Sequence, residues 1–189
     1  MISGIDLVKY LLKEYGPLPQ KKLQKLAYLA EIGYIKKHGE RLTDLSFKRY
    51  YFGPYSDDIR NIEDLDENII VSERQNVGYI IKESKLSNPR NIEPIKSKAL
   101  REEIHSLIGN HSRSSGNILE KVADNTEPFL ETDKLNDPID LDGYAWYCSK
   151  INSPEFWKDA EEADKKNEEN HVYGKHVIHD SSELDSLFQ

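Results

Sequence analysis

The 189-residue sequence lacks most of the features that identify an enzyme, a metalloprotein or a membrane protein. It has no glycine-rich phosphate loop, no pair of metal-binding cysteines and no nucleophile elbow. No stretch approaches ~18 apolar residues, and the N-terminus has no basic region followed by an apolar run and a cleavage site. We therefore expect a cytoplasmic protein that makes no membrane contact, uses no cofactor and catalyses no reaction.

The residues that could support chemistry are few and poorly arranged for it. Cys148 is the only cysteine, so it cannot form an intrachain disulfide, and its aromatic setting favours a packed thiol over a nucleophile. His105 and the serines after it could be a base and a nucleophile, but nothing in the sequence orients the histidine. Three histidines lie near the C-terminus: His171, His176 and His179. Their spacing fits no standard ligand pattern, so we predict no metal site.

Charge is unevenly distributed along the chain. The net charge is -8, yet residues 1–60 carry eight lysines and three arginines against seven acidic residues, a net charge of +4. The remainder carries 15 basic and 27 acidic residues, a net charge of -12. This division suits a basic patch that meets an acidic protein or a polyanion, although it also fits charges that follow exposed helix faces.

The N-terminal third is predicted to be helical. Ser3 can cap a first helix that ends at Gly16-Pro17. A second helix, from about residue 19 to Gly39, is apolar over so wide an arc that it must be covered from several sides. We therefore expect it to be the buried central helix of the domain.

The rest of the chain predicts one hairpin and further helices. After a short helix over 57–65, two apolar runs, 69–71 and 79–81, flank a polar stretch that ends in Asn76-Val77-Gly78, as in a β-hairpin. Beyond Pro94 helical periodicity returns, first up to Gly109 and then again after the break at Ser114-Ser115-Gly116. A loop-rich stretch follows over 124–141, and a short packed helix is expected around Tyr144, Trp146 and Tyr147. Ser153-Pro154 then begins a highly charged helix and tail. The predicted fold is mainly α, of the α+β class, with a domain at 1–153 and a charged C-terminal segment at 154–189.

Two segments carry the most specific information. Residues 21–30 read KKLQKLAYLA, and residues 47–56 read FKRYYFGPYS, an aromatic run stopped by Gly53-Pro54. Together they resemble the Panacea domain, the family of SocA-like antitoxins of toxin–antitoxin systems. The resemblance rests on Leu23-Gln24-Lys25-Leu26, on Leu42, and on the spacing F-x-x-aromatic-x-x-G-P from Phe47 to Pro54. Where the family usually carries an acidic and a small residue, this chain has Lys48 and Arg49.

The resemblance implies a protein that binds a cognate toxin and either blocks it or delivers it for degradation with the help of a protease chaperone. The alternative is a DNA-binding regulator, because a helix followed by a hairpin is also the order of a winged helix. Against this alternative, the helix that would read DNA carries Asp57, Asp58, Glu63 and Asp64 and only Arg60 to offset them. We therefore do not expect DNA to be the partner.

The candidate partner surface lies on the two segments that carry the resemblance. Lys22 and Lys25 share a helix edge, and Lys25 could either contribute to a partner surface or hold the aromatic turn in place. In the aromatic run we expect Tyr50 and Phe52 to face the core and Tyr51 and Tyr55 to face solvent, with Gly53 and Pro54 shaping the backbone. The predicted site residues are Lys22, Lys25, Tyr28, Tyr51, Gly53, Pro54 and Tyr55.

Overall fold

The computed structural model describes residues 1–76 and 79–170. Its contacts divide the chain between Asn152 and Ser153 into two units. The first unit contains the helices α1 (Gly4–Tyr15), α2 (Gln20–His38), α3 (Asp57–Arg60), α4 (Ile62–Leu65), α5 (Lys98–Ile108), α6 (Gly116–Asp124), α7 (Glu127–Leu130) and α8 (Leu141–Ile151), with the 3-10 turn Gly109–His111. In the second unit the structure describes the charged helix α9 (Pro154–Asn170).

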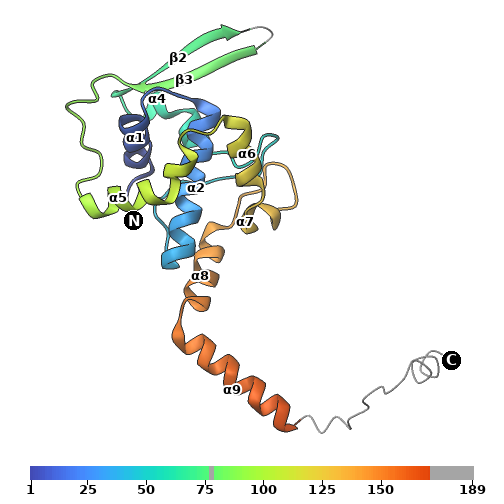
Figure 1. The fold of residues 1–189 in the computed structure, drawn as a ribbon. Helices are drawn as coiled ribbons and strands as arrows, with labels where there is room; N and C mark the ends of the chain where they lie inside the picture. Colours follow the sequence, from blue (N-terminus) through green and yellow to red (C-terminus); the bar gives the residue numbers. More distant parts are fainter. Residues whose placement is uncertain (77–78, 171–189) are drawn as a thin grey trace, which may run out of the picture. The chain divides into compact units, whose positions relative to one another are not determined.

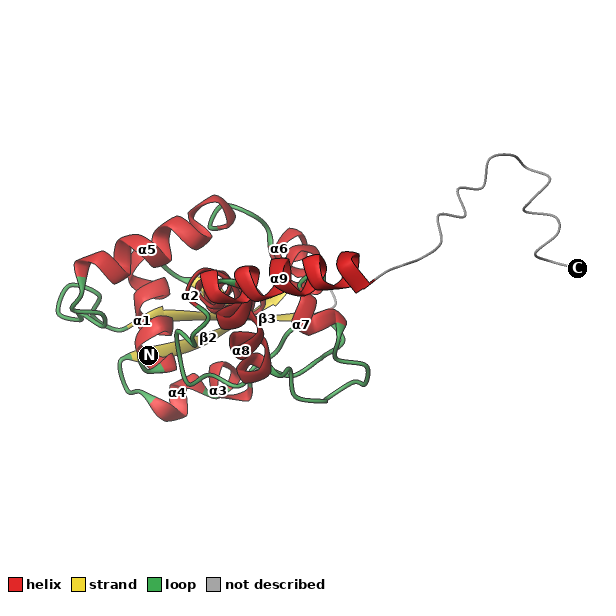
Figure 2. Ribbon diagram, turned by 90° about the horizontal axis from the view of Figure 1, so that it is seen from below, coloured by secondary structure: helices red, strands yellow, loops and turns green. Residues whose placement is uncertain are grey.

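The first unit is built around α2. In Figures 1 and 2 this helix lies in the middle of the unit, and α1, α5, α6 and α8 all pack against it. Its residues Leu23 to Ile32 are buried without interruption, as a helix that is apolar on nearly every side requires. Gly39 ends it in the left-handed conformation, with φ of 67°. The prediction of a buried central helix is confirmed.

The hairpin is confirmed and is part of a slightly larger sheet. β2 (Ile69–Asn76) pairs antiparallel with β3 (Tyr79–Leu86), with Ile69 opposite Leu86 and Asn76 opposite Tyr79. A two-residue strand, β1 (Leu18–Pro19), pairs with the other side of β3, so that the order is β1-β3-β2. The outer half of the hairpin extends beyond the helices (Figure 1). The fold class is mainly α with one small antiparallel sheet, as predicted.

Three local predictions need correction. The expected helix over 57–65 is two short helices, because Asn61 leaves the helical conformation and its backbone carbonyl accepts a turn bond from Asp64. The predicted loop over 124–141 contains α7, whose start has Thr126 as N-cap and a proline in the first turn. Trp146 and Tyr147 do lie on a helix, but they occupy its exposed side.

Candidate partner-binding surface around the aromatic corner

Residues 50–55, which we call the aromatic corner, belong to a long irregular segment held in place by polar side chains of α2. The first of these is Gln24, which is buried. Its amide donates to the carbonyl of Ser56 and accepts from the backbone N–H of Ser56, both at 2.8 Å. Since buried backbone groups must be paired, Gln24 does for this segment what a neighbouring strand would do.

Lys25 is also buried, at 2% exposure, and it holds the corner from within. Its Nζ donates to the carbonyl of Pro54 at 2.7 Å. Burial lowers the pKa of Lys25 to about 8, and the nearby carboxylate of Asp124 acts in the opposite direction. Burial also raises the pKa of Asp124. The sequence left open whether Lys25 contributes to a partner surface or holds the aromatic turn in place; in the structure it holds the turn.

Gly53 is required by the same arrangement. Its φ of +81° lies in the left-handed region, which favours glycine. A Cβ atom built on Gly53 would collide with Oδ1 of Asp124 and lie 3.1 Å from Nζ of Lys25. The backbone of the corner can therefore pass close to Lys25 and Asp124 because residue 53 has no side chain.

Two further polar residues of α2 bind other segments around the helix: Tyr28 binds the start of α7, and Glu31 binds the loop that follows α2. Tyr28 donates from its hydroxyl to Oγ1 of Thr126 at 2.7 Å, since that oxygen itself donates to the carbonyl of Ala123. Glu31, fully buried, accepts from the backbone of Leu42 and Thr43 and from the side chains of Thr43 and Arg41, at 2.6–3.1 Å. Burial raises the pKa of Tyr28. The buried polar positions 24, 28 and 31 follow helical spacing along α2.

Lys48 and Arg49, where this chain departs from the usual family pattern, have defined roles. Lys48 forms an ion pair with Asp57 at 2.6 Å and lies over the ring of Tyr55. Arg49 donates from one nitrogen to the carbonyls of Phe129 and Thr132, both at 2.8 Å. Its guanidinium also lies 4.4 Å from the centre of the Phe129 ring. Arg49 thus fastens the corner to α7 and the loop after it.

The predicted site residues differ widely in burial. Four of the seven, Lys25, Tyr28, Gly53 and Pro54, are buried and do not form an outer face. Lys22 and Tyr55 are half-buried, while Tyr51 is 72% exposed. The helix edge expected to carry both lysines exposes only Lys22, because the corner covers Lys25.

The expectation that Phe52 faces the core is wrong. Phe52 is 61% exposed, next to Tyr51, which is also exposed. The alternation of sides holds only in an extended strand, and here the N–H of Gly53 bonds back to the carbonyl of Tyr50 at 3.1 Å. Tyr51 and Phe52 therefore occupy the two central positions of a turn, where both side chains project outward.

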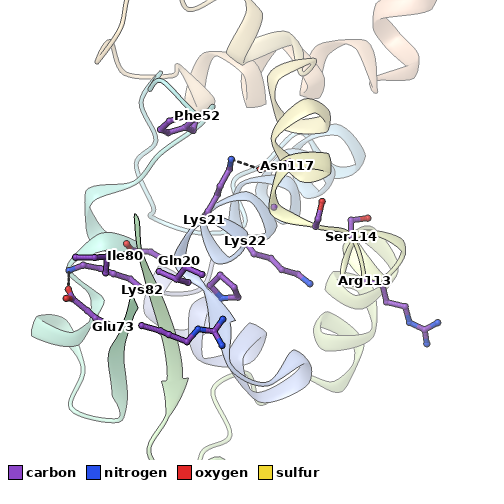
Figure 3. Close-up of a pocket in the computed structure, with 15 residues that line it drawn as sticks. Gln20, Lys21, Lys22, Phe52, Glu73, Ile80, Lys82, Arg113, Ser114 and Asn117 are labelled. Atoms are coloured by element: carbon purple, nitrogen blue, oxygen red, sulfur yellow. Dashed lines mark hydrogen bonds and ion pairs between the residues drawn. The ribbon is translucent and has the colours of Figure 1, made fainter. Parts of the chain in front are cut away.

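An open groove of about 1110 Å³ lies beside the corner. Figure 3 shows Phe52, Ile80 and Lys82 on one side, Ser114 and Arg113 on the other, and the first turn of α2 between them. Lys21 lies over the Phe52 ring, bonds Asn117 at 2.9 Å and pairs with Glu120. The full lining is Pro19, Gln20, Lys21, Lys22, Phe52, Glu73, Arg74, Ile80, Ile81, Lys82, Arg113, Ser114, Ser115, Gly116 and Asn117.

The groove is basic with apolar patches. Lys82 forms an ion pair with Glu73 at 3.0 Å. Among the described residues that line the groove, Glu73 is the only acidic one. Lys22, Arg74 and Arg113 form no ion pair with any residue that the structure describes. The positive charge expected from the first 60 residues is thus joined at the groove by cations from β2, β3 and the segment before α6.

The other residues considered for chemistry are placed as follows. Cys148 is buried, which raises the pKa of its thiol, and His105 lies against Tyr15, 3.2 Å from its hydroxyl. Residues 1–76 and 79–170 contain no group of three or more potential metal ligands. His171, His176 and His179 lie outside the described residues. No helix in the described part of the chain is long and apolar enough to cross a membrane.

The structure thus shows a helical domain whose central helix uses a few buried polar side chains to hold an aromatic Gly-Pro corner. Residues 23–147 match the family described as antitoxin SocA-like, Panacea domain. The match spans more than half of the chain, and the protein belongs to this family, which gives it the domain of an antitoxin of toxin–antitoxin systems. No curated protein and no solved structure matches the chain.

The sequence reasoning missed Gln24 and Glu31 as attachment residues and missed the hairpin's part in the groove. For the two side chains a signal existed, because polar residues within a helix that is apolar on nearly every side are buried and need partners. For the hairpin no local signal existed. Its approach to the start of α2 depends on the short strand β1, which local sequence patterns do not reveal.

Proposed function

We propose that this protein acts in the cytoplasm as an antitoxin that neutralises a cognate toxin by binding it directly through the tip of the aromatic corner and the adjoining groove. The observation that carries the proposal is the exposure of Tyr51 and Phe52 on a corner that is held from beneath by a hydrogen bond from the buried Lys25. Large exposed aromatic side chains on a preorganised turn are favourable anchors for a protein partner. No reaction and no cofactor is part of the proposal.

The test is rescue from toxicity. The open reading frame beside this gene is expressed under an inducible promoter, with and without the antitoxin candidate. We expect Tyr51→Ala/Phe52→Ala to lose neutralisation, because the variant removes the exposed anchors. The matched control, Trp146→Ala/Tyr147→Ala, removes two aromatic side chains of similar exposure from α8 and should neutralise as the wild type does. Equal rescue by both variants would contradict the proposal.

Neutralisation by occlusion and delivery of the toxin to a protease are two consequences that the same contact could have. They differ in the lifetime of the toxin. Occlusion leaves a stable complex that copurifies, whereas delivery through a protease chaperone shortens the lifetime of the toxin when the antitoxin is present. A pulse-chase measurement of the toxin, with the Tyr51→Ala/Phe52→Ala variant as reference, separates them.

Regulation by DNA binding is the second reading of the sequence, and we propose that DNA is not the partner. The helix before the hairpin is divided into α3 and α4, four residues each, and neither is long enough to act as a recognition helix in a major groove. Both carry acidic residues in their first turn. In a gel-retardation assay with random duplex DNA at physiological salt, the affinity should be no better than the non-specific range, a Kd of about 10⁻⁴–10⁻⁶ M.

A further inference from the structure

The sheet leaves one strand position beside β3 unfilled within the described part of the chain. β1 pairs with β3 only at Ser84 and Glu83, because the chain turns into α2 at Gln20. No described strand pairs on that side with the preceding residues of β3, 79–82, although β2 pairs with them on the other side. The backbone of this part of β3 therefore has a free edge with unpaired donor and acceptor positions.

The free edge lies along the groove. Three consecutive residues of β3, Ile80, Ile81 and Lys82, line it. Consecutive residues of a strand point to opposite faces, so a strand that lines a groove with all three meets the groove with its edge. Pro19, the end of β1, lines the same groove and marks where the short strand stops. The groove thus continues the line of β1.

The chemistry of the groove selects an acidic occupant with some apolar side chains. Three cations that form no ion pair with a described residue, Lys22, Arg74 and Arg113, come from α2, from β2 and from the segment before α6, and all three line the groove. The exposed ring of Phe52 and the exposed branched side chain of Ile80 supply apolar contact. The negative charge of Glu73, the one acidic residue in the described lining, is paired with Lys82. An extended segment that alternates acidic and apolar residues satisfies both features.

We infer that the groove binds an extended acidic segment of the toxin, which pairs with the free edge of β3 as an additional strand in line with β1. This inference rests on the proposed function and specifies the kind of partner segment. Strand addition supplies affinity through backbone hydrogen bonds, while side-chain contacts along the groove supply specificity. The four residues at 79–82 offer room for about four residues of a partner strand.

The test uses defined peptides with the full-length protein. The probe is a fluorescein-labelled octapeptide of alternating Glu and Val, and its Lys-Val counterpart is the charge control; binding is followed by fluorescence anisotropy. We expect saturable, salt-sensitive binding of the acidic peptide alone. Binding of neither peptide at millimolar concentration, or equal binding of both, would overturn the inference.

Two N-methylated forms of the acidic peptide test strand pairing itself. In a strand, the N–H groups of the Val residues point to one edge and those of the Glu residues to the other. Methylation of one set should weaken binding about tenfold or more, through the loss of at least two hydrogen bonds, while methylation of the other set should have little effect. An equal response to the two methylations would show that the peptide does not pair as a strand.

Charge reversal connects the groove to neutralisation. The variant Lys22→Glu/Arg74→Glu/Arg113→Glu should bind the Lys-Val peptide in preference to the acidic one and lose toxin neutralisation. The control Lys96→Glu/Lys121→Glu/Lys134→Glu changes the net charge equally at exposed positions outside the groove and should behave as the wild type. If the groove variant neutralises the toxin normally, the inference fails while the antitoxin function stands. If the wild type binds the peptide by strand pairing but rescues no toxicity, the antitoxin function fails instead.

Discussion

The two halves of the aromatic corner are neighbours in sequence and opposites in environment. Gly53 and Pro54 are buried over Lys25, while Tyr51 and Phe52 project into solvent. The buried half is the Gly-Pro pair that contributes to the family resemblance, and the hydrogen bond from Lys25 to the Pro54 carbonyl ties it to α2. The comparison teaches that Gly53 and Pro54, by which this domain is recognised, are residues that build it, whereas the residues we propose as partner contacts lie one or two positions away.

The largest expected effect is on the attachment of the segment before the corner. Glu31→Ala removes a buried carboxylate that pairs with Arg41 and accepts from two backbone N–H groups. Breaking a buried ion pair and leaving its donors unsatisfied should lower the free energy of unfolding by about 3–5 kcal/mol. Urea unfolding followed by circular dichroism measures it. The exposed Glu40→Ala variant is the control and should unfold as the wild type does; similar losses in both variants would contradict the assigned role.

A second test addresses the buried half of the corner. Gly53→Ala places a Cβ against Asp124 and forces a side chain into the left-handed region, and should cost about 2–4 kcal/mol of stability. Gly116→Ala is the matched control, because there the nearest atom to a new Cβ is in the flexible Lys21 side chain at 3.5 Å. The double variant Gly53→Ala/Asp124→Ala should recover part of the loss. Additive losses in the double variant would show that the collision is not the cause.

The pH dependence of stability reports on Lys25. Its pKa in the folded protein is lowered from 10.5 to about 8, so between these values the unfolded chain binds more protons than the folded one. Stability therefore rises as the pH increases from about 8 to 10.5, and the cost of the buried charge is fully present below pH 8. Compared with Lys25→Met, the wild type should gain on the order of 2 kcal/mol over this range. Parallel pH profiles of the two proteins in urea unfolding would contradict the burial of Lys25.

The smallest expected effect is at the tip. Tyr51→Ala/Phe52→Ala should change the free energy of unfolding by less than about 0.5 kcal/mol, because both side chains are exposed. The same variant is expected to abolish toxin neutralisation. A thermal unfolding curve shifted as strongly as that of Gly53→Ala would show that the two halves of the corner do not differ in role.

Much of the fold could be predicted because it depends on local patterns. Ser3 caps α1 through a hydrogen bond to the N–H of Ile5, Gly39 ends α2, and the two apolar runs around residue 77 form the hairpin. The start of α7 is marked locally as well, by Thr126 at the N-cap and a proline in the first turn. These features depend on neighbours within a few residues, which the sequence displays directly.

The candidate site was less predictable, and Lys22 and Lys25 show why. They are three residues apart on one helix and look alike in the sequence, yet Lys22 lines the groove and Lys25 is covered by Gly53-Pro54. The covering segment arrives from about 30 positions further along the chain. The free edge of β3 has the same origin, because it exists only where β1 stops short beside it.

The sequence by itself determined the helical class, the central helix, the hairpin and the family, since helical and strand periodicity, capping residues and a spaced motif are properties of the chain alone. The tertiary structure decided which polar and aromatic side chains are buried. Burial depends on which distant segments meet, and a buried lysine needs an acceptor for its hydrogen bonds, such as the carbonyl of Pro54. For this reason the aromatic corner was recognisable from its residues, whereas its division into a buried half and an exposed half could be known only from the structure.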